Sequence, residues 1–323
     1  MTGYDRAHAR DEDYPYFMCD GCGLVSLYPL PAPEKLADFY PEDYASHTIP
    51  QSWDQRRLLR RLAIRYFYGT QSLHQPRAMR ALWRAFSGRV MRDLCEPSGA
   101  NRLLDVGCGT GGLMEKHRRL GWTVYGIEPS SRACTVCRSL GLEVHQGSVF
   151  DAPFESRQFD VILLNHVIEH FPDPILALRQ LTRFLAPGGK VVVRTPNIHG
   201  IGFTIYRSCW RALEAPRHLF LFDPCTIRLL AGRAGLTARK VTTRPEAKML
   251  CESRHYARTQ GQRLPTGLAV RESLVSRRTA ETEWDRLYRK IVSPLALLLS
   301  FFGRGDTLLA ELSLDQERRD SIG

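Results

Sequence analysis

The feature that most constrains the fold is a short apolar run that ends in a cluster of glycines, LLDVGCGTGG at residues 103–112. Gly107, Gly109 and Gly112 match the G-x-G-x-x-G pattern, in which a strand turns sharply into a helix. Glycine allows the tight turn and leaves the backbone bare, so that a ligand can approach closely. The run therefore predicts an α/β sheet with a ligand site at the end of one strand.

Strand-like and helix-like segments alternate from residue 101 onward. Runs typical of strands occupy 103–106, 123–127, 142–145, 161–164 and 190–194, and helix-like segments occupy 113–120, 132–140 and 175–185. This alternation predicts a doubly wound α/β fold, with a mostly parallel sheet covered by helices on both faces. After Pro196 we expect helices at 203–213, 226–234 and 284–302 and strands at 236–243 and 307–314.

The composition divides the chain into segments. We expect a small knuckle with irregular chain at 1–50, an Arg-rich helical segment at 51–98, a main domain at 99–315 with insertions at about 198–235 and 247–302, and a polar tail at 316–323. The N-terminal residues lack the apolar stretch of a secretory signal, and the nine cysteines are then expected to be reduced thiols. The sequence predicts a cytoplasmic protein.

The net charge of +11 is concentrated in one window. Between Asp54 and Asp93, ten Arg minus two Asp give +8, and apolar residues interleave with the arginines at helical spacing. Basic amphipathic helices suit an anionic membrane surface, a phosphate-bearing substrate or nucleic acid. A solvated helix face whose apolar side packs on the main domain explains the pattern equally well. A membrane-peripheral location is one of these alternatives.

Two carboxylates indicate which kind of ligand the glycine loop holds. Glu128 ends a strand about twenty residues after the loop, where a carboxylate accepts the two hydroxyls of a ribose. Asp105 stands two residues before the first glycine and would repel a pyrophosphate but attract a cationic ligand. S-adenosylmethionine carries a sulfonium and an ammonium and no phosphate. In the alternative interpretation, Asp105 only braces the loop through hydrogen bonds to its amides.

Residues 101–197 resemble the Rossmann-like S-adenosylmethionine-dependent methyltransferases in the stretches LLDVGCGTGGL, VYGIEPS, FDVILLNHVIEHFPDP and LAPGGKVVVRTPN. The resemblance implies a seven-stranded sheet, mostly parallel, with an antiparallel last strand. It also implies the cofactor-binding residues. These are Asp105, Gly107, Cys108 and Gly109 at the methionine part, with Gly111 beside them; Glu128 at the ribose, with Pro129 beside it; Ser148, Val149 and Phe150 at the adenine; and Asn165 and His166 closing over the cofactor.

The N-terminal segment is similar to the zinc-knuckle lead-in of methyltransferases from bacterial sugar and polysaccharide pathways, through Cys19-x-x-Cys22-Gly23-Leu24 and Pro29. Those relatives carry two C-x-x-C knuckles, but no cysteine precedes Cys19 here. A structural zinc takes four ligands, so Cys19 and Cys22 make an incomplete site, and a metal-free form is favoured. A second C-x-x-C, Cys134 and Cys137, falls in an expected helix.

The candidate catalytic residues follow the fourth strand of the expected sheet. His166, Glu169 and His170 lie there, and the i to i+4 spacing would put the two histidines on one face of a helix. The cluster resembles that of ubiquinone-pathway O-methyltransferases, some of which hold a divalent metal with acidic residues and a His. This chain has His166 where such enzymes have the first acid. A purely structural Glu169–His170 pair is the alternative.

His218 is the second candidate base, in the insertion expected to cover the acceptor pocket, because an imidazole can take a hydroxyl proton near neutrality. The favoured function is methyl transfer from S-adenosylmethionine to an oxygen, and less favourably to a nitrogen or carbon, of a small molecule or sugar, free or linked to a nucleotide or lipid. The alternatives are an RNA methyltransferase and a non-catalytic binding protein. Against methylation of exocyclic base amines, Asn165 is followed by His-Val-Ile rather than Pro-Pro-aromatic.

Overall fold

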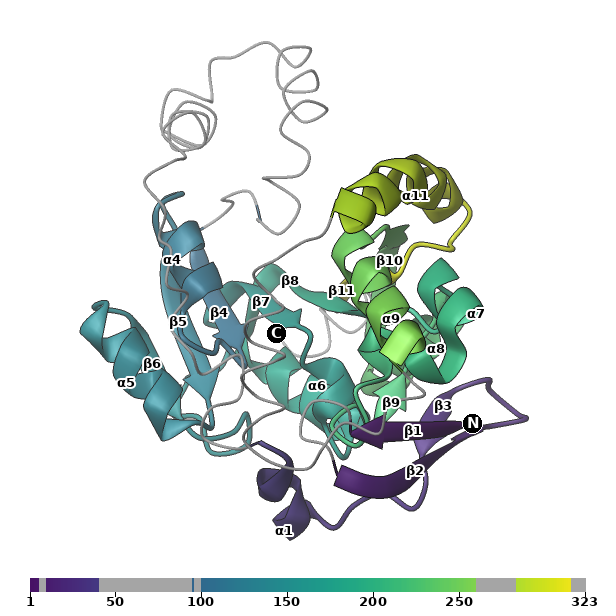
Figure 1. The fold of residues 1–323 in the computed structure, drawn as a ribbon. Helices are drawn as coiled ribbons and strands as arrows, with labels where there is room; N and C mark the ends of the chain where they lie inside the picture. Colours follow the sequence, from purple (N-terminus) through teal and green to yellow (C-terminus); the bar gives the residue numbers. More distant parts are fainter. Residues whose placement is uncertain (6–9, 41–94, 96–99, 260–282, 315–323) are drawn as a thin grey trace. The chain divides into compact units, whose positions relative to one another are not determined.

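The computed structural model describes residues 1–5, 10–40, 95, 100–259 and 283–314 (Figure 1). The expected Arg-rich helices, apart from Cys95, and the expected polar tail lie outside the described residues. The chain divides into two compact units. The first unit comprises Met1–Phe39, His166–Leu176 and Val193–Leu312, and the second comprises Tyr40–Asn165, Ala177–Val192 and Ser313–Gly323.

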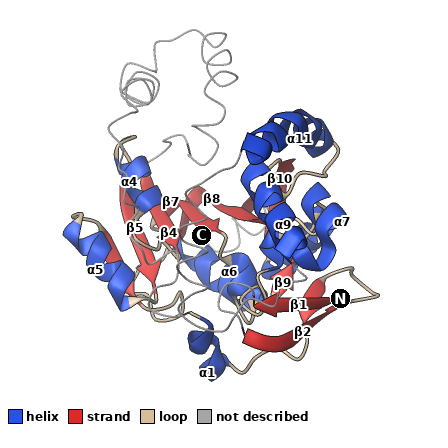
Figure 2. Ribbon diagram, in the orientation of Figure 1, coloured by secondary structure: helices blue, strands red, loops and turns tan. Residues whose placement is uncertain are grey.

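A seven-stranded sheet has the strand order β10-β11-β8-β7-β4-β5-β6. Its strands are β4 (Arg102–Val106), β5 (Thr123–Glu128), β6 (Glu143–Gln146), β7 (Phe159–Asn165), β8 (Leu185–Pro196), β10 (Leu236–Arg244) and β11 (Thr307–Leu314). In the parallel part, Leu104 stands opposite Tyr125 of β5 and Ile162 of β7. The mostly parallel sheet with one antiparallel end confirms the predicted Rossmann-like class (Figure 2).

The described residues also form helices. They are α1 (Pro33–Leu36), α4 (Gly112–Arg118), α5 (Ser131–Ser139), α6 (Pro174–Phe184), α7 (Ile201–Tyr206), α8 (Pro224–Ala234), α9 (Ala247–Thr259) and α11 (Glu283–Phe301). Helix α8 illustrates the rules: Asp223 and Thr226 form a capping box, and Gly235 ends the helix at φ 84°. No described helix combines the length and hydropathy that crossing a bilayer requires.

The core of the second unit forms where adjacent parallel strands are apolar on both faces. Leu103 and Leu104 of β4 and Ile162 of β7 are fully buried. Leu103 packs in one cluster with Met114 of α4 and Cys137 of α5, which are also fully buried. This packing holds the carboxyl end of β4 in place, where the glycine loop starts.

The N-terminal residues form strands rather than the expected knuckle with irregular chain. A four-stranded sheet, in which neighbouring strands are antiparallel, is made of β1 (Thr2–Asp5), β2 (Arg10–Met18), β3 (Val25–Leu27) and β9 (Phe220–Leu221). The reason is burial at alternate positions: Tyr14 and Tyr16 pack in a cluster with Trp210. The Tyr16 hydroxyl also donates to the carbonyl of His218 at 2.7 Å.

The helix expected at 203–213 is broken into three pieces. Helix α7 ends at Tyr206, and two short 3₁₀ turns follow, η6 (Arg207–Cys209) and η7 (Arg211–Leu213). Arg207 has φ 46° and Trp210 is extended, and neither conformation continues a helix. After this break in the helix, the side chains of Trp210 and His218 are both buried.

Candidate active site

The glycine loop has the backbone that the sequence predicts. Gly107, Gly109 and Gly111 have φ angles of 65°, 54° and 76°. Residues that carry a Cβ rarely adopt such positive φ angles. The N–H groups of Gly107 and Cys108 donate to the carbonyl of Ile127 at 2.8 and 3.2 Å. A Cβ on Gly111 would lie 2.5 Å from a methyl carbon of Leu142. The loop therefore depends on glycine for its shape.

Glu128 links the loop to strand β5. Its Oε2 accepts from the N–H of Gly109 at 2.8 Å, and its Oε1 accepts from the N–H of Ser130 at 2.9 Å. The carboxylate is almost fully buried. Each carboxylate oxygen can accept more than one hydrogen bond, so both can still receive a hydroxyl. This geometry is compatible with the predicted ribose contact.

Asp105 is a buried carboxyl on β4. Burial, reinforced by the charge of Glu128 and opposed by Lys116, raises the pKa of Asp105 to about 7. No hydrogen bond to this carboxyl comes from the described part of the chain, so the structure does not support the alternative in which Asp105 braces the loop. A buried acid without donors is suited to a cationic ligand group.

The loop after β6 contains the three residues expected at the adenine. Ser148 donates to Asp151 Oδ1 through both its N–H, at 2.6 Å, and its hydroxyl, at 3.0 Å. Val149 is buried and Phe150 is exposed. Asp151 is absent from the sequence prediction, and its position between Ser148 and His145, at 3.2 Å from the imidazole Nε2, organises the loop.

The turn after β7 is not the helix that would place His166 and His170 on one face. His166 has φ 58°, and only Ile168–His170 form a 3₁₀ turn, η5. The His166 N–H donates to the carbonyl of Arg194 at 2.7 Å, which ties this turn to β8. A positive φ at a residue with a Cβ is strained, and such strain concentrates at functional sites.

Glu169 lies at the centre of a cluster in the first unit and is completely buried. Its Oε2 accepts from the hydroxyl of Thr195 at 2.9 Å. Its Oε1 lies 3.4 Å from Nδ1 of His166 and 3.9 Å from Nε2 of His218, without a well-aligned hydrogen bond. Burial raises the pKa of Glu169, but the imidazoles of His166, His218 and His170 outweigh burial and lower it to about 2.

His170 and His218 complete this cluster, with ring centroids 4.7 Å apart. Nδ1 of His170 contacts the carbonyl of Arg217 at 2.9 Å, and Nδ1 of His218 contacts the carbonyl of Ala212 at 2.7 Å. Because a carbonyl only accepts, each of these Nδ1 atoms is a donor, and Nε2 is the other nitrogen of each ring. Burial, with help from His170, lowers the pKa of His218 to about 4 against the attraction of Glu214 and Glu169.

The structure adds two residues that the sequence prediction lacks. Thr195 fixes the Glu169 carboxylate, and Glu214 holds the segment that carries His218. Glu214 pairs with Arg211 at 2.8 Å and with Arg217 at 3.3 Å. The contact of Thr195 with Glu169 joins residues that are distant in the sequence, whereas Glu214 pairs with residues three and four positions away and could have been found from that spacing.

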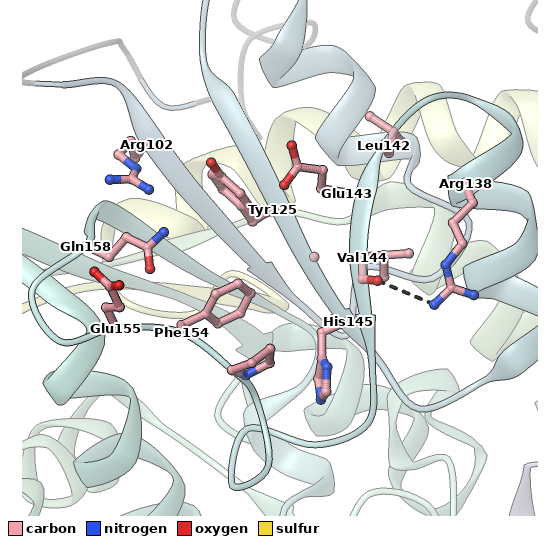
Figure 3. Close-up of a pocket in the computed structure, with 12 residues that line it drawn as sticks. Arg102, Tyr125, Arg138, Leu142, Glu143, Val144, His145, Phe154, Glu155 and Gln158 are labelled. Atoms are coloured by element: carbon pink, nitrogen blue, oxygen red, sulfur yellow. Dashed lines mark hydrogen bonds between the residues drawn. The ribbon is translucent and has the colours of Figure 1, made fainter.

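A hollow of about 710 Å³ lies in the second unit, away from all predicted site residues (Figure 3). Arg102 at the start of β4, Glu143 at the start of β6 and Phe154 line it, and Arg138 reaches across to the carbonyl of Val144 at 3.5 Å. Parallel sheets bind ligands at the carboxyl ends of their strands, whereas Arg102 and Glu143 of this hollow stand at the amino ends of β4 and β6. It is not assigned to the cofactor.

Comparisons with known proteins agree with this geometry. The family described as "Methyltransferase domain" matches residues 51–241. A ubiquinone biosynthesis O-methyltransferase from Caulobacter sp. (strain K31) is 39% identical over 108 residues, which are 30% of this chain and 41% of that protein. One from Ruegeria pomeroyi is 38% identical over 122 residues, 35% of this chain and 49% of that protein. The chain thus spans less than half the length of these relatives.

Two solved structures of methyltransferases are distantly similar to this chain. A methyltransferase from Thermotoga maritima, described as a possible histamine N-methyltransferase, has a TM-score of 0.41 at 22% identity and covers 57% of this chain and 85% of its own. One from Archaeoglobus fulgidus has a TM-score of 0.44 at 18% identity and covers 77% and 99%.

The sheet order and the glycine loop define a Rossmann-like nucleoside-binding fold. The family match covers more than half of the residues, and the chain belongs to the S-adenosylmethionine-dependent methyltransferases. The predicted family and cofactor are confirmed.

Proposed function

We propose that this protein transfers the methyl group of S-adenosylmethionine to a hydroxyl oxygen of a small-molecule or sugar acceptor. The observation that carries the proposal is the contact between the partly exposed imidazole of His166 and the buried carboxylate of Glu169, 3.4 Å apart, directly after β7. Methylation of a hydroxyl needs a base, and this pair supplies one. The matched relatives, which are named as O-methyltransferases, support the same bond type.

The proposed step is an in-line displacement at the methyl carbon. A lone pair of the acceptor oxygen forms the C–O bond as the C–S bond breaks, and that electron pair stays on sulfur in S-adenosylhomocysteine. Glu169 faces Nδ1 of His166, which leaves Nε2 to take the hydroxyl proton. A carboxylate in this position fixes the tautomer and stabilises the imidazolium. Glu169 is a positioning residue, and His166 is the base.

Glu169, His170 and His218 also fit a divalent cation, the metal that the resemblance to ubiquinone-pathway enzymes implies. Their ligand atoms lie within 4.8 Å of one another. The Glu169 Oε1 has no hydrogen-bond partner, and both imidazoles contact carbonyls through Nδ1, so Nε2 is the nitrogen with which each would bind a metal. A cation held there would act as a Lewis acid and lower the pKa of the acceptor hydroxyl.

The function is tested with methyl-labelled S-adenosylmethionine and a panel of catechols, phenols and nucleotide sugars. Reactions are run with Mg²⁺ and with EDTA, and products are identified by mass spectrometry. Label on an acceptor oxygen supports the proposal. Label only on nitrogen, carbon or added RNA overturns it, as does absence of transfer by a protein that binds S-adenosylhomocysteine.

Glu128→Ala is expected to weaken binding of S-adenosylhomocysteine by about 1–3 kcal/mol, because a charged acceptor for two ribose hydroxyls is lost. Titration calorimetry measures the change. Glu128→Gln is the matched control, since it keeps the shape and one acceptor oxygen. An unchanged dissociation constant in the Ala variant would remove Glu128 from the ribose site.

The proposed acceptor includes lipid-linked molecules because the C-terminal end of α11 exposes a row of large apolar side chains. These are Leu295, Leu297, Leu298, Phe301 and Phe302. Phe301 and Phe302 are 79% and 74% exposed, and the exposed Arg304 follows them. Apolar side chains beside a basic residue suit the surface of an anionic bilayer.

Phe301→Glu is expected to lower co-flotation of the protein with vesicles that contain phosphatidylglycerol. The substitution places a negative charge in an apolar contact with an anionic membrane surface, which repels it. Leu229→Glu, at an exposed leucine on α8, is the matched control and should float like the wild type. Equal flotation of both variants would exclude α11 as a membrane contact.

A further inference from the structure

The segment that carries His218 is hydrogen-bonded to the N-terminal hairpin, which β2 and β3 form. The carbonyl of His218 accepts from the hydroxyl of Tyr16 on β2 at 2.7 Å. The next carbonyl, that of Leu219, accepts from the N–H of Leu27 on β3 at 2.9 Å. β3 then pairs antiparallel with β9, which continues the same segment. The hairpin therefore holds two consecutive carbonyl groups of the chain at and after His218.

The same segment is bonded to the residues that follow β7. The Leu219 N–H donates to the carbonyl of Glu169 at 2.8 Å. Nδ1 of His170 contacts the carbonyl of Arg217 at 2.9 Å, and Nε2 of His218 lies 3.9 Å from Oε1 of Glu169. Both the backbone and the carboxylate of Glu169 therefore lie against a segment that the hairpin holds. All of these residues belong to the first unit.

Tyr16 is suited to hold a backbone carbonyl at any working pH. Its side chain is almost fully buried and packs in a cluster with Trp210 and Leu213. Burial raises the pKa of Tyr16 well above its usual range, so the phenol keeps its proton and remains a donor. A buried carbonyl that loses its donor destabilises the fold unless it finds another partner. Removal of this hydroxyl is therefore expected to loosen the segment at His218.

The turn of the hairpin keeps its two donors in register. The Cys19 N–H donates to the carbonyl of Leu24 at 2.9 Å across this turn, and Tyr16 then stands directly opposite Leu27. Cys19 and Cys22, the two cysteines of the expected incomplete zinc site, lie in the same turn. Two thiols alone do not complete the four ligands that a structural zinc takes.

We propose that Tyr16 is a positioning residue of the active site, which fixes Glu169 through the backbone of residues 218–219. The inference rests on the proposed function, in which Glu169 orients the imidazole of His166. Tyr16 does not touch the acceptor; it acts through the segment that it holds. A displacement of about 1 Å in a catalytic group can lower the rate of the chemical step about 10²-fold, so a single buried hydrogen bond can matter for turnover.

The test compares Tyr16→Phe, which removes the donor and keeps the ring, with the wild-type protein. kcat is expected to fall roughly 10- to 100-fold while KM changes less. Binding of S-adenosylhomocysteine should not change, because Glu128 and the glycine loop belong to the second unit. Tyr14→Phe removes a hydroxyl two positions earlier on the same strand, and this matched control should keep the wild-type kcat. 4-Aminophenylalanine in place of Tyr16 restores an N–H donor and should recover most of kcat.

Hydrogen exchange followed by mass spectrometry tests the same contact without an assay of methyl transfer. In Tyr16→Phe, the peptide that contains Leu219 should exchange faster than in the wild type, whereas the peptides of β4 and β5 should not change.

Unchanged exchange at Leu219 or an unchanged kcat in Tyr16→Phe overturns the proposal. An equal loss of kcat in Tyr14→Phe, or no recovery with 4-aminophenylalanine, shows a merely structural role and also overturns it. Absence of methyl transfer by the wild-type protein overturns the proposed function instead, and the exchange measurement then still decides whether Tyr16 holds the segment.

Discussion

His166→Ala is expected to lower kcat by about 10²–10⁴-fold while binding of S-adenosylhomocysteine persists. The reason is the loss of the partly exposed imidazole that lies 3.4 Å from Glu169, whereas His218, 3.9 Å from the same carboxylate, is buried. Single-turnover rates with labelled cofactor measure the chemical step directly. Turnover at the wild-type rate would remove His166 as the base.

The Glu169→Gln variant tests whether Glu169 positions the catalytic imidazole of His166 or only supports the local structure. The variant keeps the shape of the side chain but removes the charge that stabilises the imidazolium of His166. We therefore expect kcat to fall by a larger factor than KM changes. His218→Ala is the comparison at the other side of the same carboxylate, 3.9 Å away. If His218→Ala lowers kcat as His166→Ala should, and His166→Ala does not, the base is His218.

The regular part of the fold was predictable because local rules and tertiary packing agree there. The apolar runs at 103–106 and 161–164 lie within β4 and β7, and the segment at 175–185 nearly coincides with α6. Strands buried on both faces are apolar throughout, which makes them visible in the sequence. The glycines of the loop were equally predictable from the sequence, because a positive φ angle restricts a position largely to glycine.

The irregular parts were not predictable, because distant residues determine them. β2 was missed since its alternate tyrosines are buried by Trp210, far along the chain. The turn at His166 departs from helix because its N–H bonds to Arg194 on β8. The sequence named His166, Glu169 and His218 but not their arrangement around one carboxylate.

The affinity for S-adenosylhomocysteine should fall as the pH is lowered below about 7, by roughly tenfold per pH unit. Burial raises the pKa of Asp105 to about 7, so the free protein carries a protonated carboxyl below that pH. An ammonium group binds the ionised form, and binding then has to release a proton. Calorimetry in buffers of different ionisation enthalpy measures how many protons are released when the ligand binds. An affinity that does not change between pH 5 and 8 would contradict the assignment of Asp105 to the amino group.

Asp105→Asn provides the internal control, because it removes the titration while keeping the shape. Its affinity should be weak and independent of pH. The sign for stability is the reverse of that for binding: a carboxyl whose folded pKa is raised favours folding at low pH and loses that contribution as the pH rises through about 7. Without ligand, the Asn variant should therefore unfold at a higher temperature than the wild type above pH 7. The ionised Asp105 carboxylate destabilises the folded protein, and binding of the cationic end of the cofactor offsets this destabilisation. The same carboxylate repels phosphate groups. We therefore expect the protein to select S-adenosylmethionine over a phosphate-bearing nucleotide.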